Sequence, residues 1–394
     1  METPEVHRPG EVAAVRRALE RMPVVGVLGP RQVGKTTLAH AVIQDAGGEN
    51  HWFDLEDPQD LALLEQPGVA LRRLGGLVVI DEVQRAPGLF PLLRVLADRP
   101  GMPARFLLLG SASPDLRRQG SESLAGRVHW HDLQGFSLAE LGMAALEKRW
   151  LRGGFPRAYL AENDEASFDW RLDLVRAVLE SDLPDLGLRV PSTTLRRFWT
   201  MLAHYHGQTW NASELARAFG TSDASVRRYL DLLTATFAVR QLLPWHANVG
   251  KRQIKAPKVY LSDSGVLHAL LGLADMPALL SHPKVGASWE GLLVTEVLRH
   301  LGARNEEAFY WGTYAGAELD LLVVRGTRKL GFEFKRTETP SMTASMRSAL
   351  VDLELESLVV VHAGDKSFEL DERVRAVPVR DVLSAIEPLD GAPD

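Results

Sequence analysis

The sequence contains no cysteine, and this absence excludes disulfide bonds, thiolate-held metals and cysteine nucleophiles. It also lacks an uninterrupted apolar run of roughly 18 residues, the length that a membrane-spanning helix needs. The start, Met1-Glu2-Thr3-Pro4, has neither the basic nor the apolar stretch of a secretory signal peptide. We therefore predict a cytoplasmic protein that has no membrane association.

The chain also lacks an excess of positive charge. Its net charge of −6 argues against nonspecific binding of nucleic acid over the whole surface. A hydrophobic fraction of 45% and a charged fraction of 24% are those of a folded globular protein. Because 394 residues exceed what one ordinary hydrophobic core contains, we expect two or three domains.

The clearest motif follows an apolar run at residues 24–28 and matches the pattern G-x-x-x-x-G-K-[ST]. This pattern is typical of a phosphate-binding loop between a buried strand and a helix. In such a loop the backbone N–H groups and the helix N-terminus face the oxygens of a polyphosphate. The nucleotide-binding residues that the motif predicts are Gly29, Pro30, Arg31, Gln32, Val33, Gly34, Lys35, Thr36 and Thr37.

Side chains of this motif, and of a second apolar run at residues 77–80, predict the chemistry of the site. Lys35 is expected to neutralise charge on the β- and γ-phosphates of ATP, and the Thr36 hydroxyl to bind Mg²⁺. The second run ends in Asp81 and Glu82, as a central parallel strand with acids at its ligand-binding edge does. We expect Asp81 to hold Mg²⁺ through water and Glu82 to orient and deprotonate the attacking water.

Two further residues are candidates for contact with the γ-phosphate. Ser111 follows the strand-like run 105–110 and is our candidate sensor of the γ-phosphate or of the attacking water. The alternative is an ordinary helix N-cap, since Ser, Pro and Asp follow at the right places. Arg127, beside Gly126, is a candidate arginine finger for its own or a neighbouring subunit. The alternative for Arg127 is a solvated surface arginine.

Five segments of the chain read Gly-Pro-Arg-Gln-Val-Gly-Lys-Thr-Thr-Leu from Gly29, Val-Ile-Asp-Glu-Val-Gln from Val79, Gly-Ser at 110 and 111, Ser-Leu-Ala-Gly-Arg from Ser123, and Gly-Gly-Phe-Pro from Gly153. Together they resemble a prokaryotic family in which an AAA-type P-loop ATPase is fused to a C-terminal domain of unknown function. The resemblance extends over nearly the whole chain. It implies nucleotide binding and a PD-(D/E)xK nuclease-like fold at the C-terminal end.

The middle of the chain shows two short helix patterns, 211–219 and 224–233, joined by a turn that contains Gly220, and then a strand-like run, 237–244. This order is typical of a winged helix-turn-helix. Residues 196–258 hold ten Lys or Arg against three acids, an excess of seven charges that suits a phosphate backbone. A winged-helix module used for protein contacts or as an ATPase lid is the alternative. The predicted DNA-contacting residues are Arg227, Arg228, Lys251, Arg252, Lys255 and Lys258.

Two strand-like runs within residues 317–335 carry Asp320 on the first strand and Glu333 and Lys335 on the second. An acid followed by Glu-x-Lys on the next strand is the arrangement of PD-(D/E)xK nucleases. Glu333 and Lys335 point to the same side because strand residues alternate faces. Asp320, Glu333 and a helical Glu290 then predict a Mg²⁺ site, with Lys335 activating water. The alternatives are a nuclease-like fold that only binds, or a structural ion pair of Asp320 with Lys335.

The sequence thus predicts an α/β protein: a P-loop NTPase parallel sheet, then an α-rich winged-helix domain and a small α/β nuclease-like domain. The expected domains are the ATPase, 1–145; a helical lid or linker with the winged helix, 146–265; and the nuclease-like end, 266–394. The predicted function is Mg²⁺-dependent ATP hydrolysis coupled to DNA binding or cleavage. The alternative is a nucleotide-switched scaffold, regulator or toxin and defence component without nuclease activity. ATP and Mg²⁺ are the expected cofactors, with DNA, a homo-oligomer through the ATPase domain and a protein as expected partners.

Overall fold

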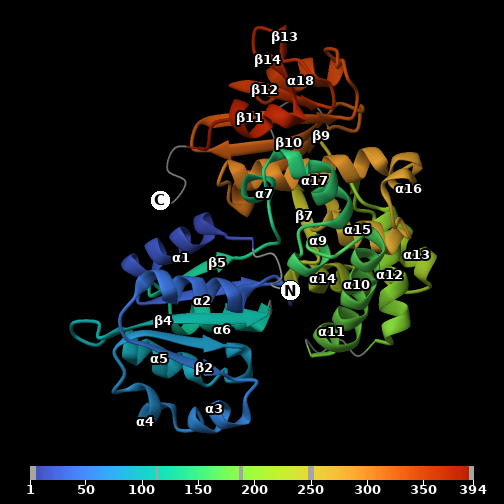
Figure 1. Ribbon diagram of the computed structural model, residues 1–394. Coiled ribbons are helices and arrows are strands. Elements are labelled where there is room, and N and C mark those ends of the chain that lie inside the picture. Colours follow the sequence, from blue (N-terminus) through green and yellow to red (C-terminus); the bar gives the residue numbers. More distant parts are fainter. Residues whose placement is uncertain (1–5, 112–113, 186–189, 247–252, 390–394) are drawn as a thin grey trace. The chain divides into compact units, whose positions relative to one another are not determined.

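The computed structural model describes residues 6–111, 114–185, 190–246 and 253–389, which divide into two units (Figure 1). The first unit runs up to Gly135 and includes Ala235–Phe237. The second unit holds Phe136–Thr234 and the chain from Ala238 onward. Among the described helices, none combines the length and the apolar character that a membrane crossing requires.

The first unit alternates strands and helices along the chain. Its strands are β1 (Val24–Gly29), β2 (Asn50–Asp54), β3 (Gly76–Asp81), β4 (Ala104–Ser111) and β5 (Val128–Asp132). Its helices are α1 (Pro9–Arg21), α2 (Lys35–Ala46), α3 (Pro58–Leu63), α4 (Pro67–Leu71), α5 (Leu89–Ala97) and α6 (Pro114–Ser123).

The five strands form one parallel sheet in the order β2-β3-β4-β1-β5. Every residue of β1 is buried, and the last four residues of β3 are buried as well, as expected for central parallel strands covered on both faces. The pairs α1–α2 and α5–α6 pack together and against strands of this sheet. The α/β parallel-sheet fold predicted for the amino-terminal domain is therefore confirmed.

Strand register brings the predicted site residues to one edge of this sheet. Gly29, where β1 ends, is paired with Ser111 at the end of β4. Asp81 ends the neighbouring β3 and is paired with Asp54 of β2. Because all strands are parallel, their carboxyl ends lie along the same edge, where ligands of open α/β sheets bind.

The second unit is larger and mixes helices with strands. Its helices are α7 (Leu138–Leu141), α8 (Leu146–Arg152), α9 (Pro156–Tyr159), α10 (Asp164–Ala177), α11 (Leu183–Asp185), α12 (Ser192–His204), α13 (Ala212–Phe219), α14 (Asp223–Ala235), α15 (Ser264–Leu271), α16 (Met276–Ser281), α17 (Val285–His300), α18 (Ala344–Asp352) and α19 (Val382–Ala385). Its strands are β6 (Gln208–Thr209), β7 (Val239–Pro244), β8 (Lys258–Leu261), β9 (Ala308–Gly312), β10 (Glu318–Arg325), β11 (Arg328–Lys335), β12 (Ser357–His362), β13 (Phe368–Asp371) and β14 (Val374–Pro378).

The two helices expected in the middle of the chain form as α13 and α14. The Asn211 side chain caps α13 by accepting the N–H of Glu214, and Gly220 ends it in the left-handed conformation. Val226 and Leu230, one turn apart on α14, are buried. The strand expected from residue 237 begins at Val239 as β7, which is antiparallel to β8.

One continuous sheet joins the middle of the chain to its end, in the order β13-β14-β12-β11-β10-β9-β7-β8-β6. The junction is the parallel pairing of β7 with β9, through Leu243 with Phe309 and Pro244 with Tyr310. Residue 265, where we expected a domain boundary, therefore lies between strands of the same sheet. Two successive residues of β10 enter separate cores: Leu321 belongs to a core with residues of α17, and Leu322 to a core with residues of α18.

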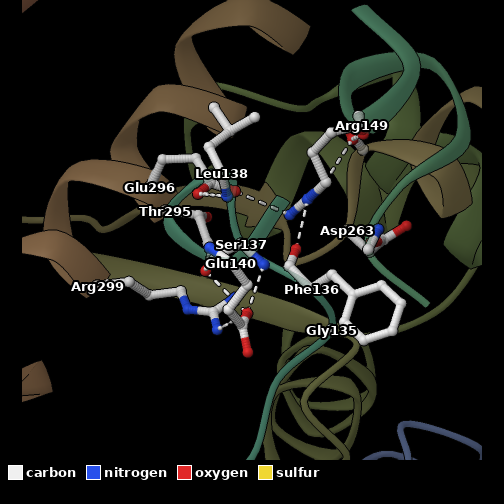
Figure 2. A network of polar contacts seen from close by, with 12 residues as sticks. Gly135, Phe136, Ser137, Leu138, Glu140, Arg149, Asp263, Thr295, Glu296 and Arg299 are labelled. Atoms are coloured by element: carbon white, nitrogen blue, oxygen red, sulfur yellow. Dashed lines mark hydrogen bonds and ion pairs between the residues drawn. The ribbon is translucent and has the colours of Figure 1, made fainter. Parts of the chain in front are cut away.

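Helix α17 anchors the segment that opens the second unit, and Figure 2 shows the contacts. Glu296 accepts the backbone N–H of Leu138 at 2.7 Å and pairs with Arg149 at 3.1 Å; both side chains are buried. Arg149 also donates to the carbonyl of Phe136 at 2.6 Å. One turn of α17 later, Arg299 pairs with Glu140 at 3.1 Å (Figure 2). These contacts fix α17, the helix that also carries Glu290.

Candidate functional site

The phosphate loop has the backbone conformation that its glycines predict. Gly34 adopts a φ of +99°, in a region that residues with a side chain rarely enter, and it immediately precedes α2. Lys35 is only 6% exposed, and its Nζ donates to the carbonyls of Gly29 at 3.2 Å and Pro30 at 3.1 Å. The first turn of α2 contains no acidic residue, so its N–H groups and dipole favour an anion.

Asp81 lies directly against the end of this loop. Its Oδ2 accepts the Thr36 hydroxyl at 2.8 Å, and its Oδ1 accepts the backbone N–H of Glu82 at 2.9 Å. Asp81 is buried, so both of its oxygens are held in place by these donors. A hydroxyl and a carboxylate brought together at the edge of a P-loop sheet are the oxygen ligands that Mg²⁺ uses.

Glu82 occupies an unusual backbone position at the end of β3. Its φ of +52° is left-handed, a conformation that costs energy for a residue with a side chain. Burial raises the pKa of its carboxyl, and a hydrogen bond from Gln84 and the charge of Lys35 oppose that shift. The Gln84 side-chain amide thus holds the Glu82 carboxylate beside Asp81.

Ser111 lies at the same edge of the sheet as the loop. Its Oγ is buried and, within the described part of the chain, has no hydrogen-bond partner. Residues 112 and 113, which would form the alternative helix cap, lie outside the described residues. The role of Ser111 as a sensor stays a prediction.

Arg127 lies at the opposite edge. Its carbonyl accepts the N–H of Val24, the first residue of β1, whereas the phosphate loop follows the last residue of that strand. Six strand residues span about 20 Å, which an arginine side chain cannot bridge. Arg127 instead forms two hydrogen bonds with Asp98, at 2.6 and 2.9 Å. A role in its own nucleotide site is excluded, and a role in a neighbouring subunit stays a prediction.

The predicted DNA-contacting residues divide into an exposed and a buried set. Arg227 and Arg228 are exposed on α14, and Lys255 is exposed before β8. Lys258 differs, since its side chain is 3% exposed and points into a cluster of carboxylates. A buried ammonium cannot contact a phosphate backbone, so grouping Lys258 with the DNA-contacting residues was wrong. Lys251 and Arg252 lie outside the described residues.

The residues predicted for the nuclease-like site do come together. Lys335 on β11 lies 3.4 Å from Asp320 Oδ2 and 2.5 Å from Glu333 Oε2. Burial and the neighbouring Asp320 charge raise the pKa of Glu333 to about 8. Although burial opposes the shift, Lys258 and Lys335 lower the pKa of Asp320. Burial and Asp320 raise the pKa of Glu290.

Lys258 also enters this cluster, and it changes what the cluster can bind. Its Nζ lies 3.2 Å from Glu290 Oε1 and 3.8 Å from Asp320 Oδ1, and it contacts the Glu318 carboxylate. Across the described ranges, no three His, Cys, Asp or Glu residues are grouped so that they could hold a metal ion. The residues present therefore do not fit the Mg²⁺ site that we expected from Asp320, Glu333 and Glu290.

Two mycobacterial proteins are similar to this chain over nearly its whole length. "Uncharacterized protein Rv2008c" of Mycobacterium tuberculosis is 52% identical over 379 residues, which cover 96% of this chain and 85% of that protein. "Uncharacterized protein Mb2031c" of Mycobacterium bovis matches to the same extent. The chain belongs to their family.

Three domain descriptions divide this member of the family. An AAA domain matches residues 21–142, and two domains of unknown function match residues 143–276 (DUF8612) and 285–382 (DUF4143). With the five-stranded parallel sheet and its phosphate loop, the chain is an AAA-type P-loop ATPase domain fused to domains of unknown function. The corresponding part of the predicted family resemblance is confirmed.

Solved structures show a weaker likeness to this family member. "The walker-type atpase paby2304 of pyrococcus abyssi" is 14% identical, with a TM-score of 0.47; the match covers 68% of this chain and 96% of that chain. The "Thermotoga maritima RuvB Holliday junction branch migration motor" is 18% identical, with a TM-score of 0.31; that match covers 60% and 90%.

Sequence reasoning missed Gln84 and Tyr260, and it assigned Lys258 to a different site. Gln84 lies two positions after Glu82 and donates a hydrogen bond to its carboxylate. The signal in the sequence was a polar side chain at the end of the Val-Ile-Asp-Glu-Val-Gln segment, close enough to reach Glu82. Lys258 and Tyr260 alternate along β8 and both contact Glu290, the hydroxyl of Tyr260 at 2.5 Å. The i and i+2 spacing of these two residues predicts a shared strand face, but nothing local to β8 identifies the helix that it meets.

Proposed function

We propose that this protein binds ATP together with Mg²⁺ and hydrolyses the γ-phosphate. The observation that carries the proposal is the 2.8 Å hydrogen bond between Thr36 and Asp81, directly beside the phosphate loop. Lys35 and the first N–H groups of α2 supply positive potential for the phosphates. Thr36 and Asp81 would hold Mg²⁺, which neutralises charge that develops on the phosphate oxygens when it is bound.

Glu82 is the proposed general base. A carboxyl with a raised pKa accepts a proton more readily near neutral pH than an ordinary glutamate does. The Gln84 amide keeps the carboxylate oriented, so that water beside the γ-phosphate can be deprotonated at one defined place.

Two variants and a control test this assignment. Glu82→Gln should retain ATP binding and lower the turnover rate by about 10²- to 10⁴-fold, the usual contribution of a general base. Lys35→Ala should lose ATP binding, measured by titration with a fluorescent ATP analogue. Glu49→Gln serves as the control because this exposed glutamate lies before β2, at the start of the strand rather than at its ligand-binding edge. Normal turnover by Glu82→Gln would refute the role of Glu82.

We also propose that the segment from α12 to β8 binds DNA. Its element order, α12-β6-α13-α14-β7-β8, is the order of a winged helix, and β6, β7 and β8 are neighbours in one sheet. The favouring observation is that Arg227 and Arg228 are exposed side by side on α14, the second helix of the helix-turn-helix.

Salt dependence tests the DNA proposal. Replacing Arg227 and Arg228 together with Ala removes up to two phosphate contacts, so the slope of log affinity against log salt should fall by about 1.8 for duplex DNA. Fluorescence anisotropy at several salt concentrations measures this slope. Arg176→Ala is the control, because Arg176 is an exposed arginine on α10, outside the segment. Binding that does not depend on salt, or that the double variant leaves unchanged, would contradict the proposal.

For the C-terminal end we propose a nuclease-like fold that holds a ligand without cutting it. The placement of Asp320, Glu333 and Lys335 on adjacent antiparallel strands, beside Glu290 of α17, supports the nuclease-like architecture. The carboxylates are paired with ammonium groups rather than arranged around a metal. The test is incubation of supercoiled plasmid with the native chain and Mg²⁺ or Mn²⁺. Nicking that Lys335→Ala abolishes would restore the alternative of a nuclease.

A further inference from the structure

Lys258 is a buried lysine whose position must be explained by its partners. Its side chain is 3% exposed, and a charged group buried to that extent is tolerated only when it is paired. Three carboxylates surround the ammonium: Glu290 on α17, and Glu318 and Asp320 on β10. The ammonium also lies 5.6 Å from the centroid of the Tyr310 ring, so an aromatic face contacts the same cation.

These three partners come from elements far apart in the sequence. Glu318 and Asp320 lie at positions i and i+2 of β10, so they share one face of that strand. Glu290 reaches the same ammonium from α17. One ammonium thus bridges a helix and a strand through carboxylate oxygens, which is the geometry that a bound divalent cation would otherwise provide.

The two oxygens of Asp320 are both committed. Oδ1 faces Lys258, whereas Oδ2 accepts the backbone N–H of Phe334 at 3.0 Å and lies 3.4 Å from Lys335. A divalent cation binds carboxylate oxygens at about 2.0 to 2.6 Å. A cation placed on either oxygen of Asp320 would therefore lie close to an ammonium group, and the like charges would repel.

We propose that Lys258 is the built-in counter-ion of this cluster and takes the place that a divalent metal would occupy between Glu290 and Asp320. This inference rests on the proposed function of the C-terminal end, from which it takes the nuclease-like architecture. It adds a physical reason why that end would not cleave its ligand. In this proposal the Lys258 side chain alone prevents the cluster from binding a metal ion. Removing that side chain should open a metal site that the native chain does not have.

The experiment is a titration of the full chain with Mn²⁺, free of nucleotide, followed by the electron paramagnetic resonance signal of unbound Mn²⁺. Lys258→Met keeps an unbranched side chain, one atom shorter, and removes its charge. We expect Lys258→Met to bind one more Mn²⁺ per chain than the native chain, which should show no Mn²⁺ binding that depends on Asp320. Adding Asp320→Asn should abolish the gain. Lys329→Met, on the same sheet but outside the cluster, should gain nothing.

Two results would overturn the proposal. One is Mn²⁺ binding by the native chain that Asp320→Asn removes, and the other is a folded Lys258→Met that gains no site. If Lys258→Met does not fold, Lys258→Met with Glu318→Gln leaves one carboxylate charge fewer to compensate, and the same gain is expected. The comparison of the native chain with Asp320→Asn needs no Lys258 variant. Plasmid nicking is measured separately. Nicking by the native chain would refute the proposed function of the C-terminal end, whereas the Mn²⁺ titration alone decides the counter-ion role of Lys258.

Discussion

The buried pair of Arg149 and Glu296 allows a quantitative prediction. Replacing Arg149 with Met leaves the Glu296 carboxylate, which is 1% exposed, without its cation. Removing one partner of a buried ion pair costs about 3 to 5 kcal/mol. Glu296 Oε1 lies 3.1 Å from the Arg149 guanidinium but does not accept an aligned hydrogen bond from it. The variant would therefore deprive this oxygen of a neighbouring positive charge rather than of a hydrogen bond. We expect the local opening of α7 and α17 to become roughly 10²- to 10⁴-fold more frequent.

Hydrogen exchange read by mass spectrometry measures this opening directly in peptides that contain α7 and α17. Arg176→Met is the matched control, since Arg176 and its partner Asp173 are both exposed. Such a surface pair contributes about 0 to 1 kcal/mol, so exchange in the control should stay close to native.

A second variant separates charge from packing. Glu296→Gln keeps an oxygen that accepts the N–H of Leu138 but carries no charge. Combined with Arg149→Met, it should restore more than half of the lost protection, because no buried charge is left unpaired. If Arg149→Met exchanges no faster than the Arg176→Met control, the reasoning about this pair is wrong.

Two further predictions concern acid stability and close packing. Burial lowers the pKa values of His206 and His268 to about 3, so as pH falls below 6.5 the unfolded chain takes up protons that the folded chain cannot. The free energy of unfolding of the second unit should therefore fall by up to about 1.4 kcal/mol per pH unit for each histidine. Urea unfolding between pH 7.5 and 5 measures this slope, which His268→Gln should reduce and which an unchanged slope would contradict. A Cβ at Gly26 would lie 2.2 Å from the ring of Trp130, so Gly26→Ala should lower the stability of the first unit by about 1 to 3 kcal/mol. A Cβ at Gly10 would have nothing within 4 Å, so Gly10→Ala is the control and should leave the stability unchanged. Equal thermal midpoints for the two variants would contradict this packing argument.

Local patterns predicted which residues meet at the edge of the amino-terminal sheet, because their positions are set by short-range geometry. The glycine spacing of the loop determines the turn into α2, and an apolar run ending in Asp81 determines a buried strand with an acid at its edge. Parallel pairing then brings Thr36 and Asp81 together without further information. The position of Arg127 was also readable, since a residue just before β5 lies at the edge opposite the loop.

The C-terminal cluster shows where sequence reasoning stops. Counting charges grouped Lys258 with exposed arginines, because a count contains no information on burial. Its partners Glu290 and Asp320 lie 32 and 62 positions farther along the chain, since Lys258 precedes both. The pairing of β7 with β9 joins the strands around β8 to those of the C-terminal end, and no local pattern in either strand encodes that pairing.

That same pairing limits how the protein can be divided into fragments. A piece starting at residue 266 would lose β7 and expose the edge of β9, together with the face of Phe309 that Trp245 covers. An exposed edge flanked by aromatic side chains is a template for pairing with other chains, so such a fragment should aggregate. Any fusion of the C-terminal end to another ATPase domain would have to carry β6, β7 and β8 along, because one sheet runs through the middle and the end of the chain.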